Sequence, residues 1–443
     1  MDLSKLILNA LGLQDEDVKI ESYDLDQKKL TACVTIRQSR ANACCPQCHK
    51  PLYGVKQWRR RELWGVPLGA FQRVKIIFYQ LQAACGQCLQ VPLAEARFIH
   101  PRFKKMTTAF AEYVGRWMEE TTIAAVERMT EHTGMSLWRL DQWRMKMMKK
   151  MFEIPADMPM SFASVDEVHM RTIRPKDARF DQSKWDKKFI TNLVSCDLAK
   201  VVANASGRSG RSLTSCLRQI PENIRDKIKF IAVDMHDAYI RAATKLCPYA
   251  NITVDRFHVA EALNRAFDEL RKQEFDKAKL ANDAFQAEML KPSKKYVLVA
   301  RKKELSKKDQ SQFERLIQVN QNISNGLILI DYFHSILDKH EVKEFRSGLK
   351  LWEELVIASK ITQFEKFLQT VKKHQSRIEA YISSKLTTAI SEGINNKIKV
   401  LKRVGYTYTN EESFKNKILQ RCGFINSRNL NTNEWHWHVP TPH

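Results

Sequence analysis

The chain has 443 residues, enough for several domains, and its 73 Lys plus Arg against 50 Asp plus Glu give a formal net charge of +23. This excess favours a polyanionic partner, most simply nucleic acid, over a basic surface without a partner. The N-terminus carries acids where a signal peptide would be basic, and no stretch reaches the roughly 18 apolar residues of a membrane span, so we expect a cytoplasmic protein with no membrane partner.

Residues 1–95 are predicted to form a zinc-binding module. A short amphipathic helix, Leu3–Leu11, precedes two strands, Val18–Tyr23 and Leu30–Ile36. Two CxxC pairs follow, and in a reducing compartment four thiolates at this spacing suit one structural Zn²⁺. The expected ligands are Cys45, Cys48, Cys85 and Cys88. Cys44 is an alternative to Cys45, because its spacing to the next cysteine is also acceptable.

A basic segment, Lys56–Arg61 (KQWRRR), lies between the two cysteine pairs, and a strand is predicted after it over Gln72–Gln82. We interpret the basic segment as a loop that the zinc holds in place. Four cations around one Trp suit contact with a DNA backbone, although a solvated loop is the alternative. The predicted DNA contacts are Arg59, Arg60 and Arg61.

Residues 96–155 have the outline of a helix-turn-helix DNA-binding domain. Thr121 or Thr122 can cap a helix that ends near Thr130, Gly134 supplies a turn, and Ser136 can cap a second helix to about residue 150. In that second helix we expect four apolar side chains to pack inward: Leu137, Leu140, Met147 and Met148. The outward stripe predicted to enter the major groove is Arg139, Gln142, Lys146 and Lys149. An ordinary solvated helix is the alternative.

The Pro-containing linker Glu153–Pro159 leads into an α/β region. The expected strands are Phe162–Met170, Phe189–Cys196, Val201–Ala205, Phe230–Asp234 and Ile252–Asp255, and the expected helices are Arg208–Leu217 and Ala238–Lys245. This order predicts a mixed α/β layer in which acids on different strands can become neighbours.

Acidic residues in apolar runs are the main functional signal, because a buried carboxylate needs a compensating cation or hydrogen bonds. Asp166 and Glu167 lie in the middle of one β-branched run, and Asp234 ends another, with Asp237 close behind. Together with Glu392 on a later helix, two strand-borne aspartates can hold two divalent ions about 4 Å apart for phosphodiester chemistry. Oxygen ligands favour Mg²⁺ or Mn²⁺ over zinc.

From Arg256 to about Ser384 the pattern is helical and charged, which indicates an all-helical insertion into the α/β region. It contains the basic run Lys291–Lys308 and an amphipathic stretch in which Trp352 is expected in the core. On the following helix one face is predicted to follow a DNA strand: Glu392, Asn396, Lys399 and Arg403. A last helix is expected over Tyr406–Ile425, and residues 429–443 are expected to be a disordered tail.

With these residues assembled, the chain resembles the transposases of the ISL-three family of bacterial insertion sequences along nearly its whole length. Besides the cysteine pairs and the helix-turn-helix, the motifs are VDE at Val165–Glu167, VDMHDAY at Val233–Tyr239, VDRFHV at Val254–Val259 and EGINNKIKVLKRVGY at Glu392–Tyr406. The resemblance implies an RNase H-like catalytic domain, residues 156–260 and 385–428, interrupted by a helical insertion, residues 261–384.

The resemblance also implies a DDE triad, which by position falls on Asp166, Asp234 and Glu392. Asp237 and Asp255 remain alternatives for the second acid, and a hydrogen bond from His258 to the scissile phosphate is a further expectation.

The implied function is a DNA transposase that binds the terminal inverted repeats of its element, cleaves the ends and joins 3′-hydroxyls to target DNA. It would use two Mg²⁺ or Mn²⁺ ions per active site and one structural Zn²⁺. It would also act as a dimer or larger assembly on nucleoid DNA. The alternatives are a non-catalytic DNA-binding regulator derived from such an enzyme, and an RNase H-like nuclease that does not join strands.

Overall fold

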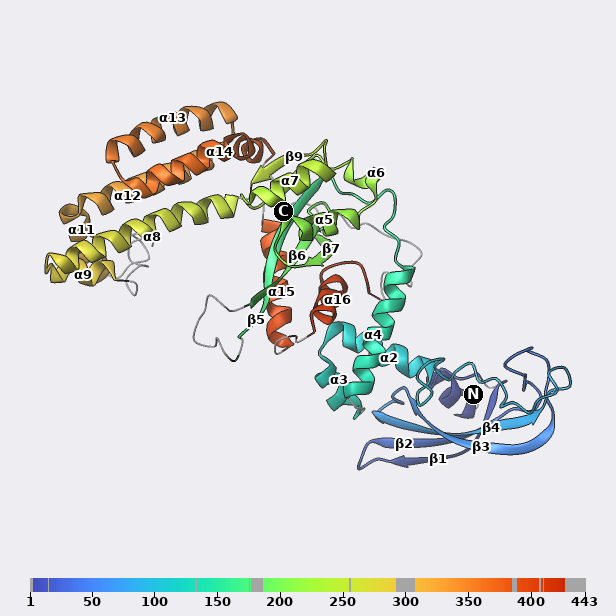
Figure 1. Ribbon diagram of the computed structural model, residues 1–443. Coiled ribbons are helices and arrows are strands. Elements are labelled where there is room, and N and C mark those ends of the chain that lie inside the picture. Colours follow the sequence, from blue (N-terminus) through green and yellow to red (C-terminus); the bar gives the residue numbers. More distant parts are fainter. Residues whose placement is uncertain are drawn as a thin grey trace. The chain divides into compact units, whose positions relative to one another are not determined.

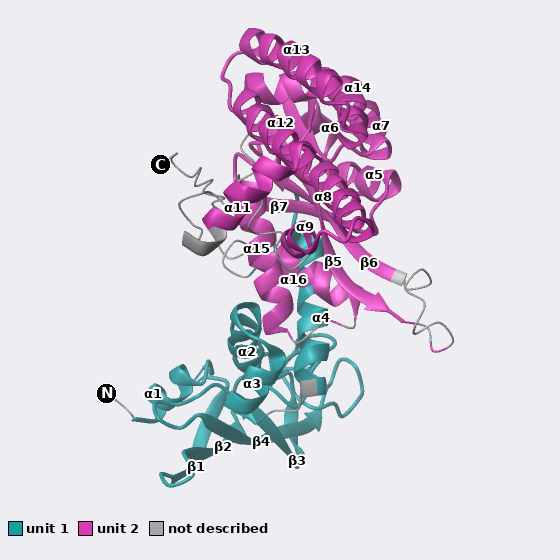
Figure 2. Cartoon of the chain, turned by 90° about the vertical axis from the view of Figure 1, so that its left-hand side faces the viewer, with its two compact units in different colours: residues 1–153, 425–435 teal, residues 154–424, 436–443 magenta. Residues whose placement is uncertain are grey.

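A computed structural model gives the arrangement of the chain, and it describes residues 3–14, 16–131, 134–174, 176, 186–254, 256–291, 307–384, 389–405, 408 and 410–426 (Figure 1). The chain divides between Glu153 and Ile154 into unit 1 and unit 2, and unit 2 continues to Phe424 (Figure 2). No helix in the described residues is long and apolar enough to cross a membrane.

Unit 1 begins with α1 and a four-stranded sheet in the order β1-β2-β4-β3. The bounds are α1 Leu3–Ala10, β1 Val18–Asp26, β2 Thr31–Gln38, β3 Tyr53–Gly65 and β4 Arg73–Ala84. Strands β2 and β4 are parallel, whereas β1 and β3 run antiparallel to their neighbours. Alternate residues of β2 and β4 are fully buried and pack against α1, for example Val34, Ile36 and Phe78. The helix and both strands predicted before the cysteines are confirmed.

The interpretation of Lys56–Arg61 as a loop is wrong, because these residues lie in the long strand β3. From Gln57 to Gly65 this strand pairs with β4. Its middle has no apolar alternation, because β3 is the edge strand of the sheet and its side chains there are mostly exposed. The strand is held by backbone pairing with β4 and by polar side chains of β4. Arg61, for instance, donates from Nη1 to Gln80 Oε1 at 3.0 Å.

Three helices complete unit 1: α2 Thr108–Glu120, α3 Ile123–Thr130 and α4 Gly134–Met151. The Thr122 hydroxyl caps α3 by accepting from the backbone of Ala125 at 3.1 Å. In α4 three of the four side chains expected to pack inward are buried, but Met147 is 38% exposed and Met145 is buried in its place. The helix therefore turns Met145, two residues earlier, toward the core.

Unit 2 contains a five-stranded sheet in the order β7-β6-β5-β8-β9. The bounds are β5 Phe162–Ile173, β6 Asp186–Ser195, β7 Lys200–Ser206, β8 Phe230–Val233 and β9 Asn251–Val254. Strands β5, β6 and β7 are antiparallel neighbours, and β5, β8 and β9 are parallel neighbours. The expected mixed α/β layer is confirmed, with the strand that carries Asp166 at its centre.

Helices cover both faces of this sheet. The bounds are α5 Gly210–Arg218, α6 Glu222–Arg225, α7 Asp237–Leu246, α15 Ala389–Val404 and α16 Glu411–Arg421. Asp166 bonds to Asn395 of α15, whereas the next residue, Glu167, bonds to Tyr239 of α7. Since consecutive strand residues point to opposite faces, α15 and α7 lie on opposite sides of β5. Helix α16 is shorter than the helix predicted over Tyr406–Ile425.

The region between β9 and α15 is helical in the part of it that the structure describes. Its helices are α8 Arg256–Leu280, α9 Ala284–Leu290, α11 Lys307–Val319, α12 Gln321–Leu337, α13 Val342–Ser359 and α14 Thr362–Ser384. Trp352 is fully buried in this bundle, where its ring is tilted against that of Phe333 with the centroids 4.7 Å apart, and it donates from Nε1 to the carbonyl of Leu329 at 2.8 Å. The bundle is tied to α7 where Lys373 donates to Asp237 at 2.7 Å.

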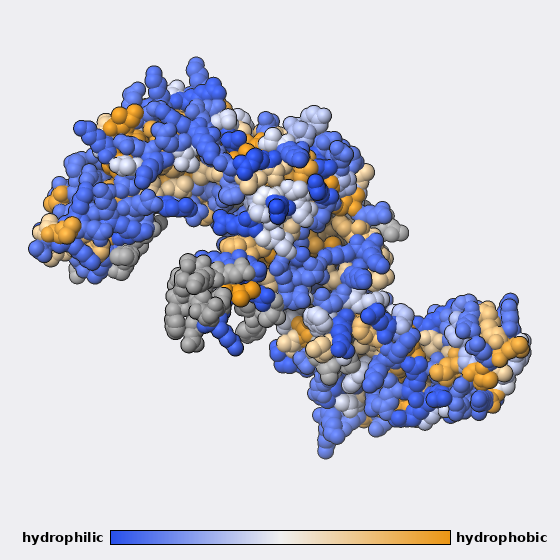
Figure 3. Space-filling model, in the orientation of Figure 1, coloured by the Kyte–Doolittle hydropathy of each residue, from blue (hydrophilic) through white to orange (hydrophobic). Residues whose placement is uncertain are grey.

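On the face shown in Figure 3, hydrophilic residues cover most of both units and hydrophobic residues form scattered patches, as the high content of charged residues leads one to expect. Most of the basic run Lys291–Lys308, and the tail 429–443, lie outside the described residues.

Candidate active site and metal centre

Asp166 occupies the middle of β5, facing α15. Its Oδ1 accepts a hydrogen bond from the backbone N–H of Glu167 at 2.7 Å, and its Oδ2 accepts one from the side-chain amide of Asn395. Burial raises the pKa of Asp166 above the usual range of an aspartate, and the nearby charge of Asp234 adds to the rise. The positive field of His258 and both hydrogen bonds act in the opposite direction. Asp166 is thus a desolvated acid whose ionised form a bound cation would stabilise.

Asp234 directly follows β8, the parallel neighbour of the strand that carries Asp166. The last pair of the β5–β8 ladder is Ser164 with Ala232, and each acid follows two residues later in the chain. The two carboxylates are near enough for the charge of Asp234 to raise the pKa of Asp166. Oδ1 of Asp234 accepts from the backbone N–H of Met235 at 2.6 Å and lies 4.0 Å from Nδ1 of His258.

The two alternatives for the second acid have different settings. Asp237 begins α7, is half exposed, and accepts a hydrogen bond from Lys373, which together with the lysine charge lowers its pKa. It is therefore already paired with a cation. Asp255 lies outside the described residues.

Glu392 lies in the first turn of α15, three residues before the Asn395 that bonds to Asp166. Residues three apart on a helix have neighbouring side chains, so Glu392 belongs to the turn of α15 beside the first acid. It is exposed, as are the other three members of the predicted face, Asn396, Lys399 and Arg403. All four residues lie in the predicted helix, and their contact with DNA stays a prediction.

Inward-facing polar residues of α15 were not predicted. Asn395 is 7% exposed, and further along the helix Lys402 donates to the carbonyl of His169 on β5 at 2.9 Å. These two bonds hold α15 along the strand that carries Asp166. The sequence offered no signal for them beyond their helical spacing, because both partners lie more than 200 residues earlier in the chain.

Glu167 is a third carboxylate near the two aspartates. It follows Asp166 in β5 and therefore points to the other face of that strand. Its side chain is 8% exposed. Burial raises the pKa of Glu167, the hydrogen bond from Tyr239 lowers it, and the charges of Asp166 and Asp234 raise it further. The Tyr239 hydroxyl is in turn 3.0 Å from Oγ1 of Thr191. Its place in the VDE motif was the signal available in the sequence.

The metal-ligand geometry of the acids differs from that of the cysteines. In the described part of the chain, one group of three or more His, Cys, Asp or Glu side chains has all its ligand atoms within 4.8 Å of one another, and it is the cysteine group. The oxygens of Asp166, Asp234 and Glu392 do not all meet that limit. The ligand atoms of two ions that lie about 3.5–4 Å apart are farther from one another than the ligand atoms of a single ion. Carboxylate oxygens are the donors that Mg²⁺ prefers.

The four predicted zinc ligands gather in unit 1: Cys45, Cys48, Cys85 and Cys88. The Sγ atoms of Cys45 and Cys88 are 3.9 Å apart, and those of Cys48 and Cys85 are 3.5 Å apart. Tetrahedral zinc with bonds of about 2.3 Å places its sulfurs about 3.8 Å apart, so the cluster fits one structural Zn²⁺. Cys44 is outside the cluster, which resolves that alternative in favour of Cys45.

The two CxxC turns share one backbone feature. The residue after each second cysteine, His49 or Leu89, has a left-handed φ of 56° or 52°. A backbone N–H points at a sulfur in one of them, where that of Cys88 donates to Sγ of Cys85 at 3.4 Å. This bond is the main reason why the pKa of Cys85 is lowered to about 7, whereas hydrogen bonding with Cys48 raises the pKa of Cys88 to about 12.

The predicted DNA-contacting arginines of β3 point to both faces of the sheet. Arg59 and Arg61 bond to glutamines of β4, and Arg60 forms an ion pair with Glu62 at 2.8 Å. On α4, Arg139 and Lys146 are exposed, and Gln142 and Lys149 are half exposed.

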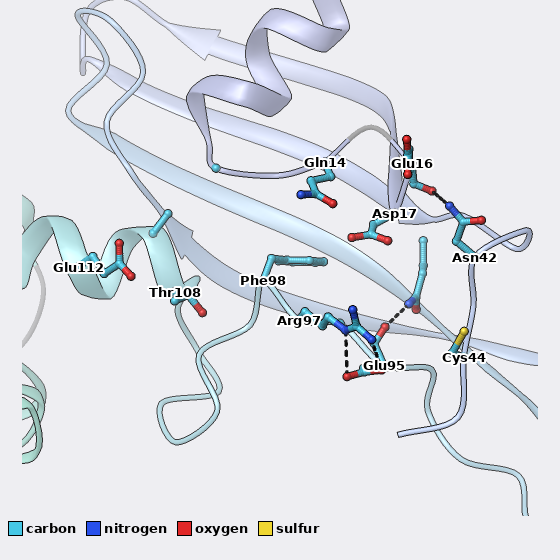
Figure 4. A pocket seen from close by; sticks show the side chains of 14 residues that line it. Gln14, Glu16, Asp17, Asn42, Cys44, Glu95, Arg97, Phe98, Thr108 and Glu112 are labelled. Atoms are coloured by element: carbon cyan, nitrogen blue, oxygen red, sulfur yellow. Dashed lines mark hydrogen bonds and ion pairs between the residues drawn. The ribbon is translucent and has the colours of Figure 1, made fainter. Parts of the chain in front are cut away.

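Unit 1 also has a cavity of about 660 Å³ between the start of β1, the loop before α2 and α2 itself. Figure 4 shows that acidic residues contribute to its lining, namely Glu16, Asp17, Glu95 and Glu112, and that Arg97 turns toward Glu95, with which it forms an ion pair at 3.2 Å. None of the predicted site residues lines this cavity.

Comparison with known proteins identifies the class. Residues 180–418, more than half of the chain, match a family model described as "Transposase". The family is the ISL-three family of DDE transposases, and the chain belongs to it. A relative from Bordetella parapertussis, "Transposase for insertion sequence element IS1001", is 24% identical over 415 residues, which cover 94% of this chain and 97% of that protein.

Proposed function

We propose that this transposase binds the terminal inverted repeats of its own insertion sequence, cleaves the DNA ends and joins the freed 3′-hydroxyls to target DNA. The observation that carries the proposal is that Asp234 follows β8, the parallel neighbour of the strand that carries Asp166, together with the bond from Asn395 of α15 to Asp166. Glu392 is on the same helix turn. In a transposase, three acids at these positions would act together on one phosphodiester.

The strand order supports an RNase H-like catalytic domain. Three antiparallel strands followed by two parallel ones, with an acid in the central strand and another after its parallel neighbour, is the arrangement that such a domain requires. The helical bundle α8–α14, between β9 and α15, corresponds to the proposed insertion. The proposed catalytic segments are residues 156–260 and 385–428.

The proposed metal ligands are Asp166, Asp234 and Glu392. Two Mg²⁺ or Mn²⁺ ions bound there would supply activation of an oxygen nucleophile and stabilisation of the leaving oxygen. In cleavage, the oxygen of water bonds to phosphorus, the bond from phosphorus to the 3′ oxygen breaks, and that oxygen takes up a proton and leaves as a 3′-hydroxyl. In joining, this hydroxyl replaces water. His258, 4.0 Å from Asp234, is suited to donate to a phosphoryl oxygen.

Recognition of the ends is assigned to unit 1, with the zinc module and α3–α4 as a helix-turn-helix. The residues proposed to contact DNA are Arg59, Arg60, Arg61, Arg139, Gln142, Lys146 and Lys149, with Asn396, Lys399 and Arg403 of unit 2. The net charge of +23 suits a polyanion whose phosphates provide much of the affinity. Two ends must be paired, so the active complex is proposed to be at least a dimer, acting on nucleoid DNA in the bacterial cytoplasm.

The test is an assay with labelled duplexes that carry the inverted repeats flanking the gene, a target plasmid and Mg²⁺. Joined products support transposition, cuts without joining support a nuclease, and binding without cuts supports a regulator. Asp166→Asn should keep end binding and lose both cutting and joining. Asp157→Asn, at an exposed position before β5, is the matched control and should retain all three activities.

A further inference from the structure

Arg208 lies beside two of the acids of the candidate site, Glu167 and Asp234, and no motif singled it out. It lies between β7 and α5, with Nε 3.9 Å from Oε2 of Glu167 and Nη2 4.0 Å from Oδ2 of Asp234. Its side chain is 54% exposed. One guanidinium thus spans an acid that follows β8 and an acid on β5, and it remains open to solvent.

The backbone around Arg208 is held firmly. Gly207 has a left-handed φ of 93°, and a Cβ at this position would lie 2.9 Å from Oγ of Ser212, so glycine is required here. The Gly207 N–H donates to the carbonyl of Phe189 and its carbonyl accepts from Thr191, both at 2.8 Å. The guanidinium carbon lies 5.4 Å from the centre of the Phe189 ring. The arginine therefore extends from a fixed turn over an aromatic support.

The donors of Arg208 are not used by its neighbours. Distances of 3.9 and 4.0 Å exceed the range of a hydrogen bond, and no hydrogen bond joins its side chain to another described residue. A structural ion pair in the same unit differs: Arg346 donates two bonds to Glu379, at 2.9 and 2.7 Å. Arg208 is thus placed by charge, and none of the described residues accepts a hydrogen bond from its planar fork of N–H groups.

We propose that Arg208 binds a non-bridging oxygen of the scissile phosphate. This inference rests on the proposed function, because it requires Asp234 to act on a phosphodiester. A guanidinium matches the geometry of a phosphate with two parallel N–H···O bonds, and it stabilises the charge that builds on phosphorus-bound oxygens during substitution. In this arrangement the proposed metal-binding acids face the reacting atoms, and Arg208 supplies a fixed positive charge to the phosphate.

The experiment compares cleavage by the full-length chain of duplex ends that carry either the native phosphate or a single methylphosphonate at the scissile linkage. Arg208→Gln should slow cleavage of the native end by about 100-fold, the loss typical of one transition-state donor. Arg208→Lys should recover part of the rate, since it keeps the charge and loses the fork. Arg218→Gln, an exposed position later in α5, is the control and should cleave at the normal rate.

The deciding result is non-additivity. Arg208→Gln and the methylphosphonate each lower the cleavage rate by some factor. If Arg208 contacts the scissile phosphate, the two changes together should lower the rate by a factor at least 10-fold smaller than the product of the two separate factors. Multiplicative penalties at the scissile linkage, or non-additivity at a flanking linkage instead, would overturn the assignment. An unchanged native rate in a variant that unfolds at the normal temperature would do the same. Failure of the wild-type chain to cut any end would instead refute the proposed function, and this inference with it.

Discussion

Replacing Asn395 with Ala tests whether Asp166 is a metal ligand that α15 orients. The side chain of Asn395 is 7% exposed and its amide donates to Oδ2 of Asp166. A hydrogen bond to a charged group contributes about 1.5–3 kcal/mol. Loss of a residue that orients a metal ligand typically weakens metal binding by about 10-fold to 100-fold, which corresponds to about 1.4–2.8 kcal/mol, so the two magnitudes agree.

The pH dependence of the same variant has a definite sign. The Asn395 bond favours the ionised carboxylate, and burial already raises the pKa of Asp166. Removal of the bond raises that pKa further, and metal binding requires the ionised form. The pH below which Mn²⁺ binding is lost should therefore move upward in Asn395→Ala.

The assay is titration of the protein with Mn²⁺, with the free ion followed by electron paramagnetic resonance between about pH 5 and pH 8. Val400→Ala is the matched control, because Val400 lies on the same helix and is 50% exposed. Equal Mn²⁺ affinity and an equal pH midpoint in Asn395→Ala and the wild type would refute the reasoning. An equal loss in the control would also refute it, since the effect would then belong to the helix and not to the bond.

Three further predictions concern the zinc cluster and the helical bundle. Cys85→Ser should reduce the zinc content, measured by mass spectrometry of the metal, from about one per chain to a small fraction, whereas Cys44→Ser should retain it. In zinc-free protein at pH 8, iodoacetamide should modify Cys85, with a pKa of about 7, well before Cys88, with a pKa of about 12. The labelling rate of Cys85 should fall at pH 6 as its thiolate protonates, and equal labelling of the two cysteines at pH 8 would contradict this prediction. Trp352→Ala should lower the free energy of unfolding in urea by about 3–5 kcal/mol, whereas Leu351→Ala, at a 48% exposed position, should change it by about 0.5 kcal/mol or less.

Strands and ligands with a strong local pattern could be predicted from the sequence. The run around Asp166 is apolar and β-branched apart from its acids, and the structure confirms a strand there. The two CxxC turns bring four sulfurs together as predicted, because each pair is a local unit and only two units had to meet. The burial of Trp352 followed from the helical period around it.

Features that depend on distant partners could not be predicted in this way. Strand β3 was missed because three consecutive arginines hide the alternation, and its pairing depends on β4. The prediction that Met147 of α4 packs inward was wrong, and Met145 is buried instead. Methionine occurs at several nearby positions of this helix, so composition cannot show which of them faces the core. Asn395 and Arg208 belong to the candidate site only through contacts with residues far away in the chain. The DNA contacts remain predictions.

The central claim is that Asp166, Asp234 and Glu392 jointly hold divalent metal. It is tested most directly by anomalous X-ray diffraction from crystals of the full-length chain with an end duplex and Mn²⁺. If these acids jointly hold metal, two Mn²⁺ peaks about 4 Å apart should appear, with oxygens of all three acids as ligands. Mn²⁺ absent from these acids, or bound by the two aspartates while Glu392 points away, would contradict it.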